Sequence, residues 1–286
     1  ANGGLVALAG MLAEHFGAIE GASIDANKGA YSSAWTIIFA VIAAIMVLIG
    51  IYHIKMLPST QVPATGKKTT SEIVTDLLNV IGNFFTKRHI VYYIFFIILY
   101  RLAEGFIMKV APLFLRASRE VGGLGLSLKE IGTLNGVFGS AAFVIGSLLG
   151  GIFVARYGLK KTLFTLCCVF NLPFIAYTFL AVVQPTSLYL IGTCITMEYF
   201  GYGFGFVGLT LFMMQQIAPG KHQMSHYAFA SGIMNLGVML PGMVSGYFSD
   251  LLGYRSFFIY VLIATIPAFL MTYFIPFTYD DSKKKK

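Results

Sequence analysis

Long apolar blocks recur along this chain of 286 residues, and they constrain its fold more than any other feature. Each block holds about 20 residues, enough for an α-helix to cross roughly 30 Å of hydrocarbon. Hydrophobic residues make up 57% of the chain and charged residues only 11%, whereas a soluble domain contains about 45–50% and about 25% respectively. The sequence therefore predicts an all-α membrane protein, in which spans are counted instead of domains.

The apolar blocks divide the chain into seven complete spans. These spans are predicted at residues 34–56, 90–114, 129–154, 162–183, 188–214, 226–248 and 257–276. Residues 1–13 resemble the end of a further span that starts upstream. Residues 57–89 form a predicted linker rich in Pro, Ser, Thr, Gly and Lys, which continues into an amphipathic helix expected at the membrane surface. Thr69 and Glu72 have the spacing of a capping box at the start of that helix, and residues 278–286 form a basic tail.

The basic residues flank the spans and predict their orientation. Because successive spans alternate in direction, thirteen Lys and Arg residues fall on one side and six on the other. The positive-inside rule places the richer side and the C-terminus in the cytoplasm, and we expect the membrane to be the bacterial inner membrane. The net charge of +8 is not gathered on one face, so no nucleic-acid partner is expected.

The distribution of cysteine and histidine argues against metal, cofactor and enzyme chemistry. The three cysteines lie inside apolar blocks without paired spacing, so they predict neither a disulfide framework nor a metal site. The five histidines lie in loops or at span ends, without the spacing of a catalytic triad. An intramembrane transferase or hydrolase is therefore disfavoured, and no cofactor is predicted.

Two segments of the chain share a short repeated pattern, in which a second glycine follows the first by seven positions and a basic residue follows two positions later. The residues of this pattern are Gly151, Gly158 and Lys160 in the first segment, and Gly246, Gly253 and Arg255 in the second. The alternation of spans puts the two segments on opposite sides of the membrane. This is the arrangement expected of three-helix units that are repeated with inverted topology, which is common in transporters.

The first segment resembles the signature loop of the major facilitator superfamily, which joins the second and third helices of each six-helix half. Gly151, Arg156, Gly158 and Lys160 match that signature, and Ala155 stands where the family usually has Asp. The resemblance implies a gating role for this loop. The counterpart residues in the second segment are Asp250, Gly253 and Arg255.

Four further segments resemble the AmpG-type branch of that superfamily, the anhydromuropeptide permeases. They are Tyr100–Glu104, Arg119–Ser127, Glu198–Phe206 and Leu240–Gly246. The resemblance implies a major facilitator-type helix bundle in which residues 34–56 end the N-terminal half and residues 90–277 form the C-terminal six-helix domain. It also implies a missing N-terminal half and a sugar-peptide substrate.

Arg101 and Glu104 are ionisable residues near the middle of the 90–114 span, and their spacing puts them on one helical face. A charge at the bilayer centre costs about 2.5–3.5 kcal/mol on insertion scales, so such residues are functional candidates by default. We expect Arg101 to bind a substrate carboxylate and Glu104 to hold Arg101 in place. The alternative is an ion pair that only fixes helix packing.

Glu198 lies about ten residues into the 188–214 span. The family resemblance puts it, with Arg101 and Glu104, on the two helices of this half that face the central cavity. A carboxyl group held away from water can take up and release protons near neutral pH, which suits a proton-coupling site. The alternative is that Glu198 caps a neighbouring arginine or hydroxyl group.

Two further polar residues within spans are weaker candidates. Lys109 could attract substrate carboxylates, or it could extend to the interface as an anchor. Asn235 could bind sugar hydroxyl groups, as could Asn135, Asn171, Gln215 and Gln216, but buried amides more often link helices.

The sequence as a whole predicts a secondary transporter of the rocking type that imports anhydromuropeptides or a related sugar-peptide with protons. Two alternatives remain. One is a membrane sensor that has a transporter fold but moves no solute, and the other is a transporter of another anionic metabolite such as acetyl-CoA.

Overall fold

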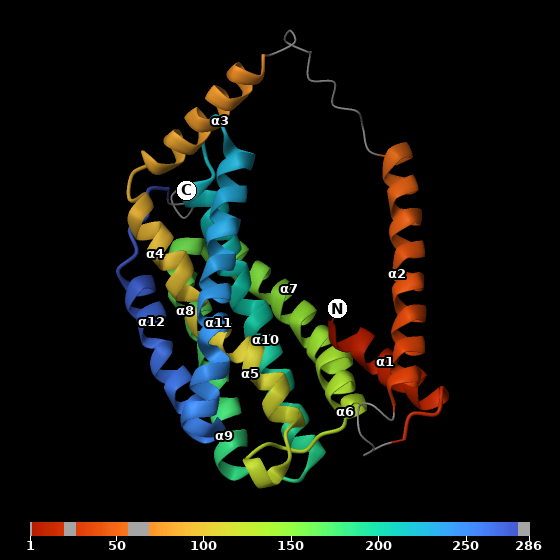
Figure 1. Cartoon of the computed structure of the whole chain (residues 1–286). Helices are drawn as coiled ribbons and strands as arrows, with labels where there is room; N and C mark the ends of the chain where they lie inside the picture. The colour runs from red at the N-terminus through yellow and green to blue at the C-terminus, as the bar shows by residue number, and fades with distance from the viewer. Residues whose placement is uncertain (1, 20–26, 57–68, 280–286) are drawn as a thin grey trace. The chain divides into compact units, whose positions relative to one another are not determined.

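The computed structural model describes residues 2–19, 27–56 and 69–279, and these residues form helices without any strand (Figure 1). Two compact units are present. The first contains Ala1–Asp76 and Leu128–Val137, and the second contains Leu77–Ser127 and Phe138–Lys286. The all-α prediction is therefore confirmed. Residues 57–68 of the predicted linker, and 280–286 of the predicted basic tail, lie outside the described residues.

The first unit is built from α1 (Asn2–His15), α2 (Lys28–Met56) and α6 (Leu128–Thr133). α1 extends two residues beyond the predicted remnant of a span, and α2 contains the predicted span 34–56. The Lys129 ammonium group lies 3.5 Å from the Glu14 carboxylate, which links α6 to α1.

The second unit holds the remaining spans. Its helices are α4 (Ile90–Tyr100), α5 (Leu102–Arg116), η1 (Arg119–Val121), α7 (Ser140–Tyr157), α8 (Leu159–Asn171), η3 (Leu172–Phe174), α9 (Ile175–Val183), α10 (Leu188–Phe212), η4 (Met213–Ile217), α11 (Gln223–Ala264) and α12 (Ile266–Tyr273). A π-helical segment, η2 (Leu134–Gly139), joins α6 to α7. These helices coincide with the predicted spans to within a few residues.

Five helical stretches in the described part of the chain are long and apolar enough to cross a membrane. They are Lys28–Met56, Ile90–Arg116, Leu128–Tyr157, Leu159–Val183 and Gln223–Tyr273. The last stretch corresponds to two predicted spans, because the backbone at Gly253 is not helical. α10 is not among the five, since Glu198 and five glycines dilute its apolar character. Its 25 residues nevertheless reach about 37 Å, which exceeds the hydrocarbon thickness.

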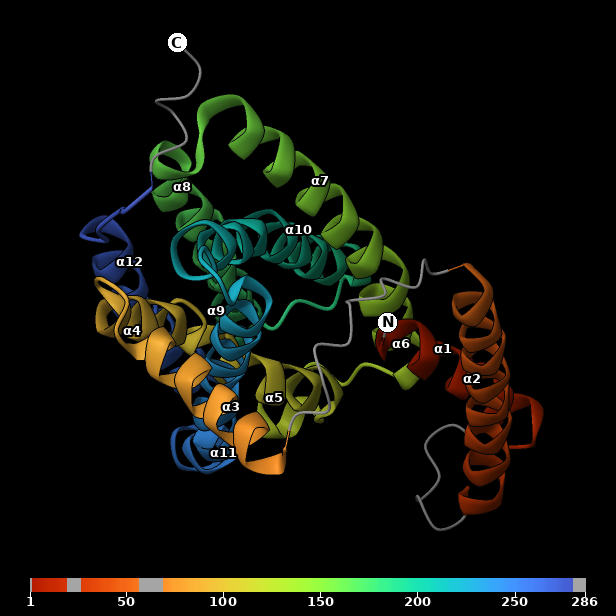
Figure 2. The same cartoon turned by 90° about the horizontal axis from the view of Figure 1, so that it is seen from above.

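Helix contacts within the second unit follow an inverted repeat. α7 packs on α10 as α11 packs on α5, and α8 packs on α10 as α12 packs on α4. The first repeat consists of the α4–α5 span, α7 and the α8–α9 span, and the second consists of α10, the part of α11 before Gly253, and the stretch after Gly253 that includes α12. When each span is replaced by its counterpart in the other repeat, the first contact of each pair becomes the second. α10 lies beside both α7 and α8 (Figures 1 and 2). This packing supports the repeat inferred from the two glycine segments.

Glycines allow the α7–α10 pair to approach to backbone contact. A Cβ atom at Gly150 would lie 2.5 Å from the carbonyl oxygen of Phe204, and one at Gly146 would overlap the carbonyl of Phe200. The α5–α11 pair has the same kind of contact, since a Cβ at Gly105 would lie 2.7 Å from the Val238 carbonyl oxygen. Glycine at these positions therefore allows close helix packing.

The predicted amphipathic helix is α3 (Thr70–Phe85). It starts with the predicted capping contact, in which the Thr69 amide donates to the Glu72 carboxylate at 2.8 Å. Its C-terminal end packs into the second unit, where the Phe84 ring is buried 5.7 Å from the Phe229 ring. Lys87 then donates to the carbonyl oxygens of Ile217 and Pro219 at the end of η4, and burial lowers the pKa of Lys87.

Gln216 in η4 holds the segment that follows α12. Its side-chain oxygen accepts from the amides of Thr278 and Tyr279 at 2.9 and 3.0 Å, and its side-chain nitrogen donates to the Tyr279 carbonyl at 2.7 Å. These contacts assign Gln216 to packing, which is the structural alternative to a sugar-binding role.

Candidate functional site

The two repeated segments form tight turns with the same backbone conformation. Gly158 has φ 82° and ψ 145°, and Gly253 has φ 69° and ψ 160°. A residue with a side chain rarely adopts these angles, so glycine permits each turn. The prediction of a loop after α7 is wrong in length: α7 continues to Tyr157 and α8 begins at Leu159, which leaves Gly158 alone between them.

Three charged residues of the two turns, Arg156, Asp250 and Arg255, form no ion pair with a described residue, which a strong gating contact would need. Among the described residues, Arg156 forms no ion pair, and its guanidinium lies 5.5 Å from the centre of the Tyr157 ring. Position 155 is alanine and offers no carboxylate. In the second turn, Asp250 interacts electrostatically with Tyr254, and Arg255 is exposed.

Arg101 and Glu104 form a buried ion pair with two parallel contacts. Arg101 Nε lies 2.6 Å from one Glu104 oxygen, and a terminal guanidinium nitrogen lies 2.5 Å from the other. Each residue is 6% exposed. The spacing argument therefore placed the two side chains correctly.

The span that carries this ion pair is interrupted at Arg101. α4 ends at Tyr100 and α5 starts at Leu102, and Arg101 between them has φ −104° and ψ 5°. Irregular backbone at membrane depth is tolerated only where protein or a cavity surrounds it. Transporters commonly use such broken helices at their binding sites.

α10 supplies the surroundings of the Arg101–Glu104 pair. The Arg101 guanidinium lies 5.3 Å from the centre of the Phe206 ring, which is cation–π distance. Tyr202 is close enough to interact with both Arg101 and Glu104. Sequence analysis did not select Tyr202, although it lies one helical turn after Glu198 and therefore on the same face of α10.

Glu198 is also brought to this region. It is 9% exposed, and its negative charge repels that of Glu104 across the two helices. In the part of the chain that the structure describes, no hydrogen bond or ion pair engages its carboxylate, so the expected alternative of a capped arginine or hydroxyl is not observed. Glu198 follows Glu104 by 94 positions, while Gly253 follows Gly158 by 95. The two carboxylates thus occupy nearly equivalent positions in the two repeats.

Lys109 and Asn235 form no hydrogen bond or ion pair with this charged group. Both are exposed, and neither forms a hydrogen bond or ion pair with a described residue. The aliphatic stem of Lys109 runs along α11, because a Cβ atom at Gly242 would lie 3.4 Å from its Cγ atom. Asn135 and Asn171 each keep a buried side-chain oxygen without a hydrogen-bond partner. Within the described ranges, no group of three His, Cys, Asp or Glu residues could hold a metal ion.

A helical chain of membrane spans that repeats with inverted topology, and that buries a charged pair at a break in one span, has the architecture of a membrane transporter. Residues 3–217 match the model of the Major Facilitator Superfamily, and the chain belongs to this family. Membership supports a transporter rather than an enzyme, and it supports a location in a membrane.

Several curated relatives carry AmpG-type names, as the sequence resemblance implied. The Anhydromuropeptide permease of Escherichia coli (strain K12) is 24% identical over 66% of this chain and 37% of its own length. Two proteins of Rickettsia conorii (strain ATCC VR-613 / Malish 7) are also similar. Putative transporter AmpG 1 is 24% identical over 77% of this chain and 50% of its own length, and Putative transporter AmpG 4 is 25% identical over 92% and 61%. The chain therefore spans between about a third and three-fifths of the length of these relatives.

Proposed function

We propose that this chain is the C-terminal part of a proton-coupled importer of anhydromuropeptides, or of a related sugar-peptide, in the bacterial inner membrane. The name of the Escherichia coli relative supports the substrate class. The observation that carries the mechanism is the buried Arg101–Glu104 pair at a helix break, with Glu198 close to it on a second helix. In this proposal an N-terminal half completes the site, and the two halves rock around it.

Arg101 is the proposed contact for a carboxylate of the substrate. A guanidinium has five N–H donors, and Glu104 uses the Nε group and one terminal nitrogen. The remaining donors are available to a second carboxylate, while Glu104 and the Phe206 ring fix the plane of the guanidinium. A rigid, planar donor group of this kind suits recognition of a carboxylate.

Glu198 is the proposed proton-coupling residue. Its carboxyl group is buried and lacks a cation of its own among the described residues, so it can exchange a proton with water when the site opens. Its interaction with Glu104 links that exchange to the Arg101 ion pair. Proton uptake and substrate binding are thereby coupled through Glu104.

Transport of an anhydromuropeptide into vesicles that contain the longer protein tests this proposal. We expect Arg101→Ala to abolish uptake and counterflow, because substrate binding is lost. We expect Glu198→Gln to abolish accumulation driven by a pH gradient but to retain counterflow, because only the proton step is lost. Arg88→Gln, an exposed change at the end of α3, is the control and should transport normally.

Normal accumulation by both the Arg101→Ala and Glu198→Gln proteins would contradict the proposed site. Binding of the sugar-peptide without any flux would instead favour a sensor. Uptake of another anionic metabolite, such as acetyl-CoA, in place of the sugar-peptide would contradict the proposed substrate but not the site.

A further inference from the structure

A pocket of about 410 Å³ lies at the Gly253 turn and has no part in the proposed transport mechanism. It is enclosed by the turn itself, by the end of α9 and by the segment after α5. Its lining residues are Val121, Gly122, Ala181, Val182, Gln184, Leu252, Gly253, Tyr254 and Arg255. Clefts of about 300–1,000 Å³ are typical of sites for small molecules.

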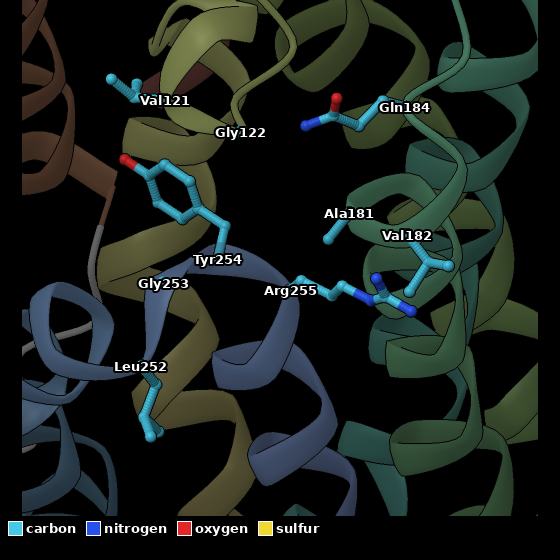
Figure 3. A pocket seen from close by; sticks show the side chains of 9 residues that line it. All are labelled: Val121, Gly122, Ala181, Val182, Gln184, Leu252, Gly253, Tyr254 and Arg255. Carbon is cyan, nitrogen blue, oxygen red and sulfur yellow. The ribbon is translucent and has the colours of Figure 1, made fainter.

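The polar groups of this pocket come from the Gly253 turn and from the segment after α9. Gln184 and Tyr254 lie on opposite sides, and Arg255 extends toward Val182 of α9 (Figure 3). No hydrogen bond or ion pair with a described residue engages the Arg255 guanidinium. Asp250, a carboxylate of the same turn, forms no ion pair with Arg255. The pocket therefore offers a cation, an amide and a phenol to a ligand.

This pocket lies at the ends of helical stretches that are long and apolar enough to cross a membrane. It lies where α9, the last part of one spanning stretch, ends and where Gly253 breaks another. Arg119 fixes this end of the unit by donating to the carbonyl oxygens of Gln184 and Pro185, each at 2.9 Å. Val121 and Val182, on the rim, are 67% and 45% exposed. Exposed aliphatic groups beside a cation match the boundary between lipid tails and headgroups.

The turn at Gly158 builds a second pocket, of about 600 Å³, from the same kinds of residue. Its lining includes Tyr157 and Gln215, with Arg156 and Lys161 as cations. The first pocket includes Gln184, in the connection between α9 and the start of α10. The second pocket includes residues near the end of α10. The two pockets therefore lie at opposite ends of the spans.

We propose that the pocket at the Gly253 turn binds the headgroup of an anionic phospholipid. Arg255 pairs with the phosphate, which guanidinium groups bind through parallel N–H donors. Gln184 hydrogen-bonds to the glycerol or ester oxygens, and the Tyr254 ring lies at headgroup level, where tyrosine is enriched. The acyl chains leave over Val121, Val182 and Leu252.

A site-specific fluorescence experiment tests this proposal on the full chain in vesicles. The chain has a single tryptophan, so Trp35→Phe combined with Leu252→Trp places a reporter on the pocket rim. Brominated phosphatidylcholine quenches this tryptophan, and unbrominated phosphatidylglycerol that occupies the pocket restores its fluorescence. We expect phosphatidylglycerol to bind about fivefold better than phosphatidylcholine, which corresponds to about 1 kcal/mol for one basic contact.

Variants assign the preference to Arg255. Arg255→Gln should reduce the ratio of the two binding constants to about one, whereas Arg255→Lys, which keeps the charge, should retain most of it. Arg88→Gln removes an exposed arginine outside the pocket and should leave the ratio unchanged. A ratio near one before any change at Arg255, or the same ratio after Arg255→Gln, would overturn the proposal. Competition by soluble glycerol phosphate would also overturn it, by showing that the pocket takes a free phosphate.

Discussion

At the residue scale, the most important energetic contact of the site is the ion pair between Arg101 and Glu104. The two charges neutralise each other inside a span. Both side chains are 6% exposed, and both Glu104 oxygens are used by the guanidinium. A buried ion pair of this kind is weak proof of added stability, because desolvation offsets the attraction. Removal of one partner has a much larger effect, because it leaves a buried charge alone.

Glu104→Ala is therefore expected to lower the free energy of unfolding by about 3–5 kcal/mol, whereas Arg101→Met/Glu104→Leu should stay close to the parent protein. Denaturant unfolding of the detergent-solubilised chain measures both. The paired variant is the control, since it removes the same contact without leaving a charge. If Glu104→Ala were as stable as the parent, the guanidinium would have to be satisfied by groups other than Glu104.

Tyr202 shows what sequence reasoning misses at this scale. The i, i+3 spacing was enough to predict that Arg101 and Glu104 meet. Tyr202 reaches them only because α10 packs against the interrupted span, and no spacing within one helix contains that information. Lys109 is the reverse of Tyr202, because the sequence selected it as a candidate. Its charge suggested a binding site, and in the structure its aliphatic stem runs along α11.

Adjacent glycines of α7 differ sharply in their surroundings at the scale of the element. Gly150 faces the Phe204 carbonyl of α10, whereas a Cβ at Gly151 would meet nothing within 4 Å. Substitutions at these two neighbouring positions of one helix therefore distinguish the effect of helix packing from the effect of helix propensity.

Gly150→Ala should destabilise the protein by about 1–3 kcal/mol, because the added methyl group pushes α7 away from α10. Gly151→Ala should leave stability equal or raise it by up to about 1 kcal/mol, because alanine favours the helix. Thermal unfolding in detergent compares the two. Equal losses for both variants would mean that the α7–α10 contact is not as close as described.

The elements themselves followed from sequence to different degrees. Apolar blocks and the capping contact between Thr69 and Glu72 predicted the helices and the start of α3. The break at Arg101 was not predicted, because neither proline nor glycine stands there and surrounding helices hold the backbone. The loop after α7 was predicted too long, since a single glycine with positive φ is sufficient to reverse the chain.

At the scale of the whole molecule, the repeat gives the second unit two equivalent turns at opposite ends of its spans. The helix contacts follow the same inverted repeat, so the pattern of the sequence and the packing of the helices agree. The charge imbalance along the chain then predicts which end faces the cytoplasm.

Cysteine labelling measures this orientation in intact cells and in inverted vesicles. In a background in which Cys167, Cys168 and Cys194 are alanine, a cysteine replacing Lys161 should react only from the cytoplasmic side. A cysteine replacing Ser256 should react only from the outside. Both positions are exposed. Labelling of both from the same side would contradict the inverted repeat, and exchanged sides would contradict the positive-inside assignment.

The position of Glu104 three residues after Arg101 has a consequence for how this protein is made. Spans enter the membrane in the order of synthesis, and α5 arrives before α10 exists to surround it. A lone arginine at the bilayer centre costs about 2.5–3.5 kcal/mol on insertion scales. Because its counter-ion lies three residues later in the same span, Arg101 enters the membrane together with its neutralising partner and needs no later helix in order to insert.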